Sequence, residues 1–505
     1  MGADVARSVY VISDLHLGGV YSETPQGRGF RINTHARQLA EFVQSIAQKP
    51  AAGPKIELVI NGDMVDFLAE REAAPPQWIP FTADPEAACA KLKAIADRDP
   101  AFFTALHDLL EANHRLTILT GNHDIELAFP LVRKKLREII GVKPNHDFEF
   151  ISNGEAYIVG DALIEHGNRY DKWNVVDYDS LRRVSSLQSR RQPIPQKWEF
   201  DPPAGSKMVS WVINQIKEDY KFIDLLKPET DVAVPLLLAL EPGYKKLLAT
   251  IAKLALQSSR HGLDEPAVPS QGGDIHAGGD FEGMSFGGDI NSGGGVDGGN
   301  VEISEEAALD QILKKHLGAD RQVFADEPEG GGDISSGNVV DRAFGIAKLL
   351  FAPSNPDIGR RLPALLKALR ALQPDRSFDV GFEAAPEYAD AARDLLKCGF
   401  RFVVFGHTHL AKKIELEPGH WYLNSGSWSD TMQLPQAILT ANPEDARAEL
   451  ERFVQQLGTS KLSHLIVFNP TFVQLDLDTN DHVLNAELVS YGNENSALAD
   501  KAAKS

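Results

Sequence analysis

Short apolar runs, each followed at once by a polar motif, are the most regular feature of this chain. Runs rich in Val, Ile, Leu and Phe occupy residues 9–12, 56–60, 116–119, 162–164 and 402–405. Runs of this length and composition predict buried β-strands.

Stretches with helical spacing separate the first of these runs. Residues 39–46 place their apolar side chains on one helical face, and Thr34 is expected to cap that helix. Pro100 and Pro130 would each open a further helix, because proline is favoured in the first helical turn, and Gly141 would end the second of them. Strands that alternate with helices predict a layered α/β architecture.

This alternation stops near residue 174 and returns near residue 391. Residues 207–259 are strongly apolar with helical spacing, and a further helix is expected over about 343–372. Between them, residues 264–341 are rich in glycine and aspartate and repeat the sequence Gly-Gly-Asp-Ile. A segment with so few apolar groups cannot offset the entropy of ordering, so we predict a disordered loop, with a calcium-binding repeat as the alternative.

The α/β core is therefore expected to be interrupted by a large, mainly helical and partly disordered insertion. The predicted segments are 1–200 (core, first part), 201–263 (helical insertion), 264–341 (low complexity), 342–395 (helical insertion, second part), 396–491 (core, second part) and 492–505 (flexible tail). The simpler interpretation of the apolar helices is the core of an extra subdomain. The functional interpretation is a lid that restricts access to a site in the core.

Charge and cysteine content narrow the class of protein. With 51 Lys and Arg against 71 Asp and Glu, the 505-residue chain has a formal net charge of −20. This disfavours binding to bulk nucleic acid or anionic membranes, but not to a small phosphate-bearing substrate held by metal ions. Cys89 and Cys398 are too few for a disulfide framework and suit a reducing compartment. No signal peptide or transmembrane segment is expected, so we predict a cytoplasmic protein and leave its oligomeric state open.

Polar motifs with metal-ligand chemistry follow directly after the five predicted strands. They are Asp14-Leu15-His16, Gly62-Asp63-Met64-Val65-Asp66, Gly121-Asn122-His123-Asp124, Glu165-His166-Gly167-Asn168 and Gly406-His407-Thr408-His409. Ligands of open α/β sheets bind outside the carboxyl ends of the strands, so these side chains are expected to converge. Imidazoles, carboxylates and an amide in this number suit two divalent cations.

Two-metal sites place their ions about 3.5–4 Å apart and need a shared ligand. Asp63 is the expected bridge, because a carboxylate can bind one ion with each oxygen. The remaining ligands would be Asp14, His16 and His409 for one ion, and Asn122, His166 and His407 for the other. Mixed carboxylate and imidazole ligation suits Mn, Fe, Zn or Co better than Ca or Mg, and manganese is our first choice.

In this order the motifs resemble the calcineurin-like metallophosphoesterase superfamily, whose pattern is D-x-H, G-D-x-x-D, G-N-H-[DE], H and G-H-x-H. The resemblance covers roughly residues 5–175 and 396–490. It implies a four-layer α/β/β/α sandwich and a dimetal phosphoesterase in which a metal-activated hydroxide attacks phosphorus. It also implies that His123 protonates the leaving oxygen and that Asp66 orients it, since a carboxylate fixes an imidazole tautomer and favours its charged form.

Within the superfamily, Ser13 to Gly18 and His166 to Asp171 look like the bacterial branch that contains UDP-2,3-diacylglucosamine pyrophosphatase. Phe67 and Leu68 stand where phosphoprotein phosphatases carry Arg-Gly. The bacterial enzyme departs from this chain in two ways, since it has arginine at the position of His123 and a far shorter insertion. The resemblance therefore does not carry a substrate with it.

The expected substrate is a small or lipid-linked phosphodiester, pyrophosphate or phosphomonoester. Asn122, Asn168 and Arg169 are the candidates to contact its phosphate, because amides donate hydrogen bonds and guanidinium matches phosphate oxygens in pairs; an ordinary polar turn is the alternative for residues 168–170. Asp124 would support the second ion or cap a helix. Two other functions are considered: a phosphoprotein phosphatase on the same fold, and a non-catalytic binding module, against which the complete ligand set argues.

Overall fold

The structure is a computed structural model, and it describes residues 5–20, 30–50, 53–73, 76–217, 219–220, 222–227, 229–244, 358–370, 376–457 and 460–492. The predictions for the glycine-rich segment 264–341, for the end of the apolar stretch (245–259) and for the tail beyond residue 492 lie outside these residues.

Six strands form the larger sheet, in the spatial order β15-β14-β1-β2-β5-β6. Their bounds are β1 Arg7–Ile12, β2 Lys55–Asn61, β5 Arg115–Leu119, β6 Phe148–Ile151, β14 Thr471–Leu477 and β15 Val483–Ser490. The strands β1, β2, β5 and β6 are parallel, whereas β14 and β15 are antiparallel to their neighbours. Ile12 lies opposite Ile60, and Ile60 opposite Ile118, so the carboxyl ends of β1, β2 and β5 lie at the same edge.

The second sheet has the order β10-β11-β9-β8-β7. Its strands are β7 Tyr157–Val159, β8 Ala162–Ile164, β9 Phe402–Phe405, β10 Lys412–Glu417 and β11 His420–Asn424. The strands β8 and β9 are parallel neighbours, with Ile164 opposite Val404, although the whole insertion lies between them in the sequence. Two short pairs complete the strands: β3 Glu72–Ala73 with β4 Pro76–Gln77, and β12 Thr431–Met432 with β13 Ile466–Val467.

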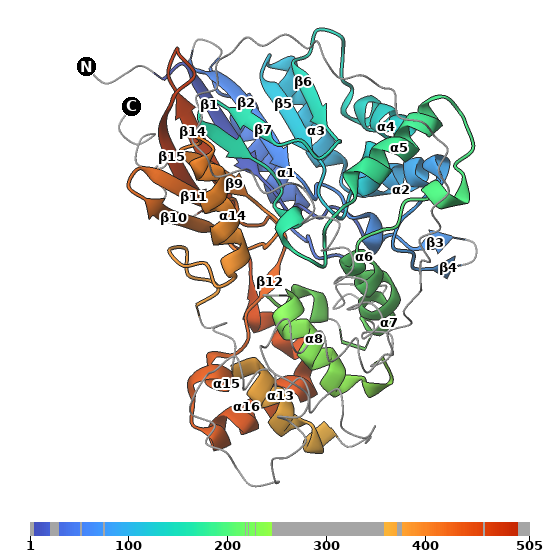
Figure 1. Ribbon diagram of the computed structural model, residues 1–505, viewed down its shortest axis with the longest axis vertical. Helices are drawn as coiled ribbons and strands as arrows, with labels where there is room; N and C mark the ends of the chain where they lie inside the picture. Colours follow the sequence, from blue (N-terminus) through green and yellow to red (C-terminus); the bar gives the residue numbers. More distant parts are fainter. Residues whose placement is uncertain are drawn as a thin grey trace, which may run out of the picture.

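The two sheets pack face to face through an apolar layer that includes Val11, Val59, Ile164 and Val404. Helices cover the outer face of the larger sheet: α1 Ala36–Ala47, α2 Pro85–Arg98, α3 Pro100–Glu111, α4 Pro130–Ile140 and α5 Tyr178–Ser189. On the outer face of the second sheet, α14 (Pro386–Lys397) packs through Tyr388 and Ala392. This arrangement is the predicted four-layer α/β/β/α sandwich (Figure 1).

A second apolar core joins helices from two distant parts of the chain, and we call this unit the helical subdomain. It contains α6 Ala204–Met208, the π-helical turn η5 Val209–Ile213, α7 Asn214–Ile216, α8 Glu229–Leu240, α13 Leu362–Arg370, α15 Gln436–Thr440 and α16 Pro443–Leu457. In Figure 1 it lies below the sandwich, and β12 leads into it. The helices α15 and α16 fall within the predicted second part of the core, yet their apolar faces pack against the insertion. Sequence order alone did not reveal that packing.

The remaining helical elements of the described residues are short 3₁₀ turns. They are η1 Phe67–Ala69, η2 Ile125–Ala128, η3 Asn168–Tyr170, η4 Gln196–Trp198, η6 Ile223–Leu225, η7 Pro242–Tyr244, η8 Ile358–Arg360 and η9 Ser460–Leu465. Among the described helices, none combines the length and apolarity needed to cross a bilayer. Both cysteines are free thiols.

The predicted helix boundaries are correct at three positions and wrong at one. As expected, α3 and α4 begin at Pro100 and Pro130, and α4 ends at Gly141 in the left-handed conformation (φ 74°). Thr34, however, does not cap α1, whose N-cap residue is His35. Its hydroxyl donates instead to Asp430 Oδ2 (2.8 Å), a long-range partner that competes with the cap.

Candidate dimetal centre

The loops that follow β1, β2, β5, β8 and β9 meet at one end of the sandwich. The backbone N–H groups of Leu15 and His16 both donate to Asp63 O (2.9 Å each), which joins the first loop to the second. Gly406 N donates to His166 O (2.9 Å), which joins the fourth loop to the fifth. The parallel strands β1, β2 and β5 end at the same edge of one sheet, and β8 and β9 end at the same edge of the other. Five motifs that are far apart in the sequence therefore share one site.

Five predicted ligands lie in the left-handed backbone region, which is unusual for residues other than glycine. Their φ angles are 54° for Asp14, 44° for His16, 51° for Asp63, 68° for His407 and 62° for His409. Such conformations cost of order 1–3 kcal/mol each and are concentrated at functional sites. The fold therefore accepts backbone strain in order to turn these side chains inward.

The glycines of the motifs allow ligand side chains to approach the backbone closely. A β-carbon at Gly62 would overlap the imidazole of His166, and one at Gly406 would lie 2.8 Å from Asp14 Oδ2. Gly62 also has a φ of 82°, which an L side chain rarely adopts. The glycine positions of G-D-x-x-D and G-H-x-H are thus fixed by contact with the ligands.

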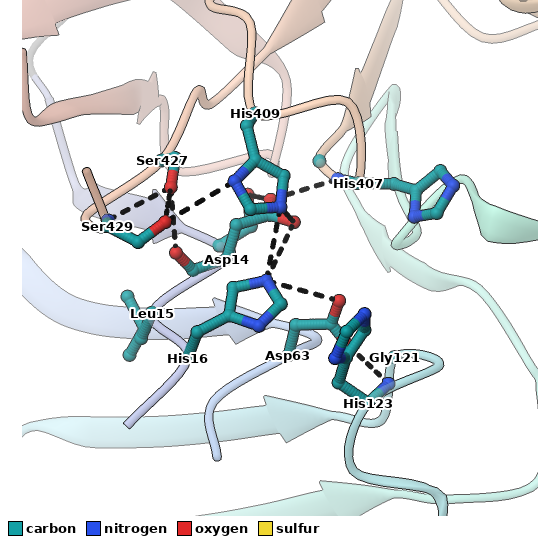
Figure 2. A network of polar contacts seen from close by, with 12 residues as sticks. Asp14, Leu15, His16, Asp63, Gly121, His123, His407, His409, Ser427 and Ser429 are labelled. Atoms are coloured by element: carbon teal, nitrogen blue, oxygen red, sulfur yellow. Dashed lines mark hydrogen bonds and ion pairs between the residues drawn. The ribbon is translucent and has the colours of Figure 1, made fainter. Parts of the chain in front are cut away.

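Asp14, His16 and His409 form the first cluster of possible metal ligands. His16 Nε2 and His409 Nε2 lie 3.1 Å apart, and Asp14 Oδ1 lies 3.5 Å from His409 Nε2 and 3.9 Å from His16 Nε2 (Figure 2). This is the set predicted for one ion.

Asp63, His166 and His407 form the second cluster. Asp63 Oδ2 lies 3.2 Å from His166 Nε2 and 3.6 Å from His16 Nε2, so one oxygen faces both clusters. The expectation of one oxygen for each ion differs from this geometry, because Asp63 Oδ1 accepts the backbone N–H of His123 (2.8 Å). Asp63 still lies between the two clusters, as its predicted bridging role requires.

Two buried oxygens indicate that cations fit this site. Asp14 Oδ1 and Asn122 Oδ1 find no hydrogen-bond partner within the described part of the chain. The other oxygen of Asp14 accepts from Ser13 Oγ (2.5 Å) and His407 N (2.9 Å), so Oδ1 is the atom turned toward the cluster. A buried carboxylate or amide oxygen without a partner is costly unless a cation binds it.

Each of the four clustered imidazoles has one nitrogen held by a neighbouring group. The contacts are His16 Nδ1 with Asp66 Oδ2 (3.3 Å), His166 Nδ1 with Asn61 O (2.8 Å), His409 Nδ1 with Ser429 Oγ (3.3 Å) and His407 Nε2 with Asp171 Oδ2 (3.1 Å). When one ring nitrogen donates its N–H to a neighbouring group, the tautomer is fixed and the other nitrogen keeps a lone pair that can bind a metal ion. Residue types alone gave no signal for Asn61, Ser429 or Asp171.

The electrostatics of the two clusters are strongly coupled. Burial alone would raise the pKa of Asp63, but the imidazoles of His166, His123 and His16 outweigh it and hold that pKa well below its usual range. Burial lowers the pKa of His166, and the charge of Asp63 more than reverses this and raises it to about 9. Burial, and then the positive charge of Lys227 from the helical subdomain, lower the pKa of His409 well below its ordinary value. The first cluster thus contains a neutral imidazole, the form that binds metals.

His123 lies beside the clusters, against Asp66. Its Nδ1 is 3.2 Å from Asp66 Oδ1, and its ring meets that of His16 edge-on at 4.6 Å between centroids. The His123 side chain is 18% exposed, whereas those of His16, His166, His407 and His409 are 1–8% exposed. Burial raises the pKa of Asp66, but His123 and His16 outweigh it and keep that pKa far below its usual range. His123 is therefore the accessible imidazole, paired with an ionised carboxylate.

The other predicted residues contact protein groups. Arg169 donates to Gly154 O (2.5 Å) and pairs with Glu165 Oε2 (3.2 Å), while Asn168 Nδ2 donates to the backbone oxygen of Asn174 (2.9 Å). These contacts agree with the polar-turn interpretation, and the proposed phosphate contacts stay predictions.

Asp124 accepts the backbone N–H groups of Gly121 (2.7 Å) and Met64 (2.8 Å). Its carboxylate therefore joins the second loop to the third. Asp124 is the N-cap residue of η2 but makes no side-chain cap there, so the capping expectation is wrong, and its support of the second ion stays a prediction. Burial, and then the charge of Asp63, raise the pKa of Asp124 to about 7.

The comparison with known families agrees with this geometry. Residues 7–223 match the calcineurin-like phosphoesterase family. The match contains four of the five motifs, and His407 and His409 lie beyond it. The match supports an assignment to the metallophosphoesterase superfamily and a metal-dependent phosphoesterase activity. Proteins of this family generally bind a dimetal centre. No curated protein matches the chain. The resemblance to the UDP-2,3-diacylglucosamine pyrophosphatase branch stays a prediction, because the match is at the level of the superfamily.

Proposed function

We propose that this protein hydrolyses a phosphodiester, pyrophosphate or phosphomonoester bond at a dimetal centre. The observation that carries the proposal is the position of Asp63, whose Oδ2 lies between the Asp14–His16–His409 cluster and the His166–His407 pair. When bound, two divalent ions would supply a nucleophilic water of lowered pKa and would screen the charge of the phosphoryl group. Manganese is the proposed metal, with Fe, Zn or Co as alternatives.

His123 is the proposed general acid. A leaving alkoxide needs a proton, and this imidazole is the most exposed of the histidines gathered at the site. Asp66 holds its Nδ1, so Nε2 is the atom that would deliver the proton. The same carboxylate holds Nδ1 of His16, so Asp66 would orient one metal ligand and the acid together.

Small or lipid-linked phosphoesters are the proposed substrates. The net charge of −20 would repel a long polyanion, whereas a single phosphate can be bound by two cations. The helical subdomain brings the charge of Lys227 close enough to affect His409, which supports a site that the subdomain partly surrounds.

Hydrolysis of bis(p-nitrophenyl) phosphate in Mn²⁺ tests the proposal. Turnover by the wild type that is abolished in Asp63→Asn is the expected result, whereas His123→Ala should lose less, because p-nitrophenolate depends little on protonation. Wild-type turnover in Asp63→Asn would refute the role assigned to this carboxylate. A strong preference for phosphopeptides over the aryl diester would instead favour a phosphoprotein phosphatase, and protein without bound metal or turnover would favour a binding module.

A further inference from the structure

Two residues outside the ligand motifs, Asp171 and Asn174, form hydrogen bonds with expected ligands of the second ion. Asp171 Oδ2 accepts hydrogen bonds from His407 Nε2 (3.1 Å) and from Asn174 Nδ2 (2.6 Å). Asn174 Oδ1 in turn accepts from Asn122 Nδ2 (3.3 Å). One short chain of side chains therefore connects two residues expected to bind the same ion.

This chain of contacts determines which atoms of His407 and Asn122 are left to bind an ion. His407 uses Nε2 as a donor to Asp171, which leaves Nδ1 with a free lone pair. Asn122 uses Nδ2 as a donor to Asn174, which leaves Oδ1, the buried oxygen that has no partner within the described residues. Reversing either group would place an N–H donor against a cation, so the two bonds select the metal-binding orientation.

Several hydrogen bonds close the loop that carries these residues. Asn174 N donates to Asp171 O (2.9 Å), Trp173 N donates to Asp171 Oδ1 (2.9 Å), and Asn168 Nδ2 donates to Asn174 O (2.9 Å). Both side chains are thus held on a closed turn and cannot change partners without breaking it.

Helix α6 of the helical subdomain rests directly on this turn. Gly205 N donates to Trp173 O (2.6 Å). A β-carbon at Gly205 would lie 2.9 Å from Asn174 Cγ and would overlap Asn174 Oδ1. Only glycine lets α6 pack this closely, so the subdomain and the second cluster meet at Asn174.

We propose that Asp171 and Asn174 are positioning residues for the second metal ion, and that α6 holds them in place through Gly205. This inference rests on the proposed dimetal function and extends it, because it makes the affinity of one ion depend on the helical subdomain. The first cluster is held by other groups, Ser429 and Asp66, and should not respond.

Manganese binding tests the inference without any assay of hydrolysis. Metal-free full-length protein is titrated with Mn²⁺ by calorimetry, and electron paramagnetic resonance distinguishes a spin-coupled pair from a single ion. The variants are Asp171→Asn, Asn174→Ala and Gly205→Ala. Their matched controls are Asp179→Asn and Asn153→Ala, both at exposed positions, and Gly381→Ala, where a β-carbon meets nothing within 4 Å.

The expected result is a Kd for the second ion that rises about 10- to 100-fold in the three variants, as for other residues that orient metal ligands. The Kd of the first ion should stay within about twofold of wild type, and the spin-coupled signal should give way to that of a single ion. Ser429→Ala should show the reverse pattern and weaken the first ion. A merely structural role would lower the affinity for both ions together or for neither.

Unchanged binding of both ions in the three variants, or equal weakening of both, would overturn the inference. Wild-type protein that binds two ions but hydrolyses no phosphoester would refute the proposed function and leave the positioning role intact. Wild-type protein that binds fewer than two ions would overturn both.

Discussion

Gly121 lies directly against the carboxylate of Asp63. A β-carbon at position 121 would be 2.7 Å from Asp63 Cγ and would overlap Oδ1. The glycine of G-N-H-D therefore allows the third loop to pack onto the residue that lies between the two clusters. Its neighbour Asn122, an expected ligand of the second ion, lies on the same loop.

We predict that Gly121→Ala destroys the centre while leaving the fold intact. The added methyl group must push Asp63 or the third loop aside, and a displacement of about 1 Å can cost about 10²-fold in rate. We expect loss of at least one bound Mn²⁺ after gel filtration, together with a fall in kcat/KM of about that size or more. Gly243→Ala, where a β-carbon meets nothing within 4 Å, is the matched control. Full metal content and turnover in Gly121→Ala would contradict this account.

The role of His123 predicts a dependence on the leaving group. An acid that protonates the departing oxygen matters most when that oxygen is strongly basic, and its contribution is typically 10²–10⁴-fold. In His123→Ala, kcat/KM should therefore fall by about this factor on an alkyl phosphodiester and by much less on a p-nitrophenyl diester. The measurement is kcat/KM on both substrates in Mn²⁺.

Metal content separates this role from ligation. His123 is expected to protonate rather than bind, so His123→Ala should retain both ions, whereas His409→Ala should lose one. Equal losses on both leaving groups, accompanied by loss of metal, would show that His123 is a ligand.

Metal removal should lower stability as well as activity. Asp14 Oδ1 and Asn122 Oδ1 are buried and have no partner within the described residues, so a bound cation relieves an unfavourable state. A ligand that binds only the folded protein contributes about 2.7 kcal/mol at 100 times its Kd. We expect the melting temperature to rise with added Mn²⁺, and to rise more than with added Ca²⁺. A chelator should lower it. Asp63→Asn should lose most of this response, and an unaltered response in that variant would argue against the site.

The strands and motifs could be predicted because each depends on a local pattern. Val9 to Ile12 forms a buried strand, and Asp14 and His16 follow it at the site, as their order indicates. The groups that hold the imidazoles could not be predicted, because Ser429 and Asp171 belong to ordinary polar turns whose partners are distant in sequence. Thr34 shows the same limit, because its hydroxyl donates to Asp430 instead of capping α1. Local chemistry predicts which residues bind, but tertiary contacts decide how they are oriented.

Glu126 is a buried carboxyl group on η2 and is 3% exposed. Its Oε1 accepts the backbone N–H of Thr82 (2.7 Å). Burial is the largest influence and raises its pKa from 4.5 to about 7. Because the folded state holds this proton more tightly than the unfolded state, stability should fall as the pH rises from about 4.5 to about 7.

Replacing the acid with an amide isolates this effect. Glutamine retains an acceptor for Thr82 and cannot ionise, so Glu126→Gln should match the wild type near pH 4.5 and become progressively more stable above it. The shift corresponds to a gain of up to about 3 kcal/mol above pH 7. The measurement is the difference in melting temperature between the two proteins from pH 4.5 to 8, with a chelator present so that metal release does not contribute. Glu417→Gln, at an exposed position, controls for the change in net charge. A difference that stays constant across this range would show that Glu126 is already ionised in the folded protein at low pH, and that burial does not dominate at this position.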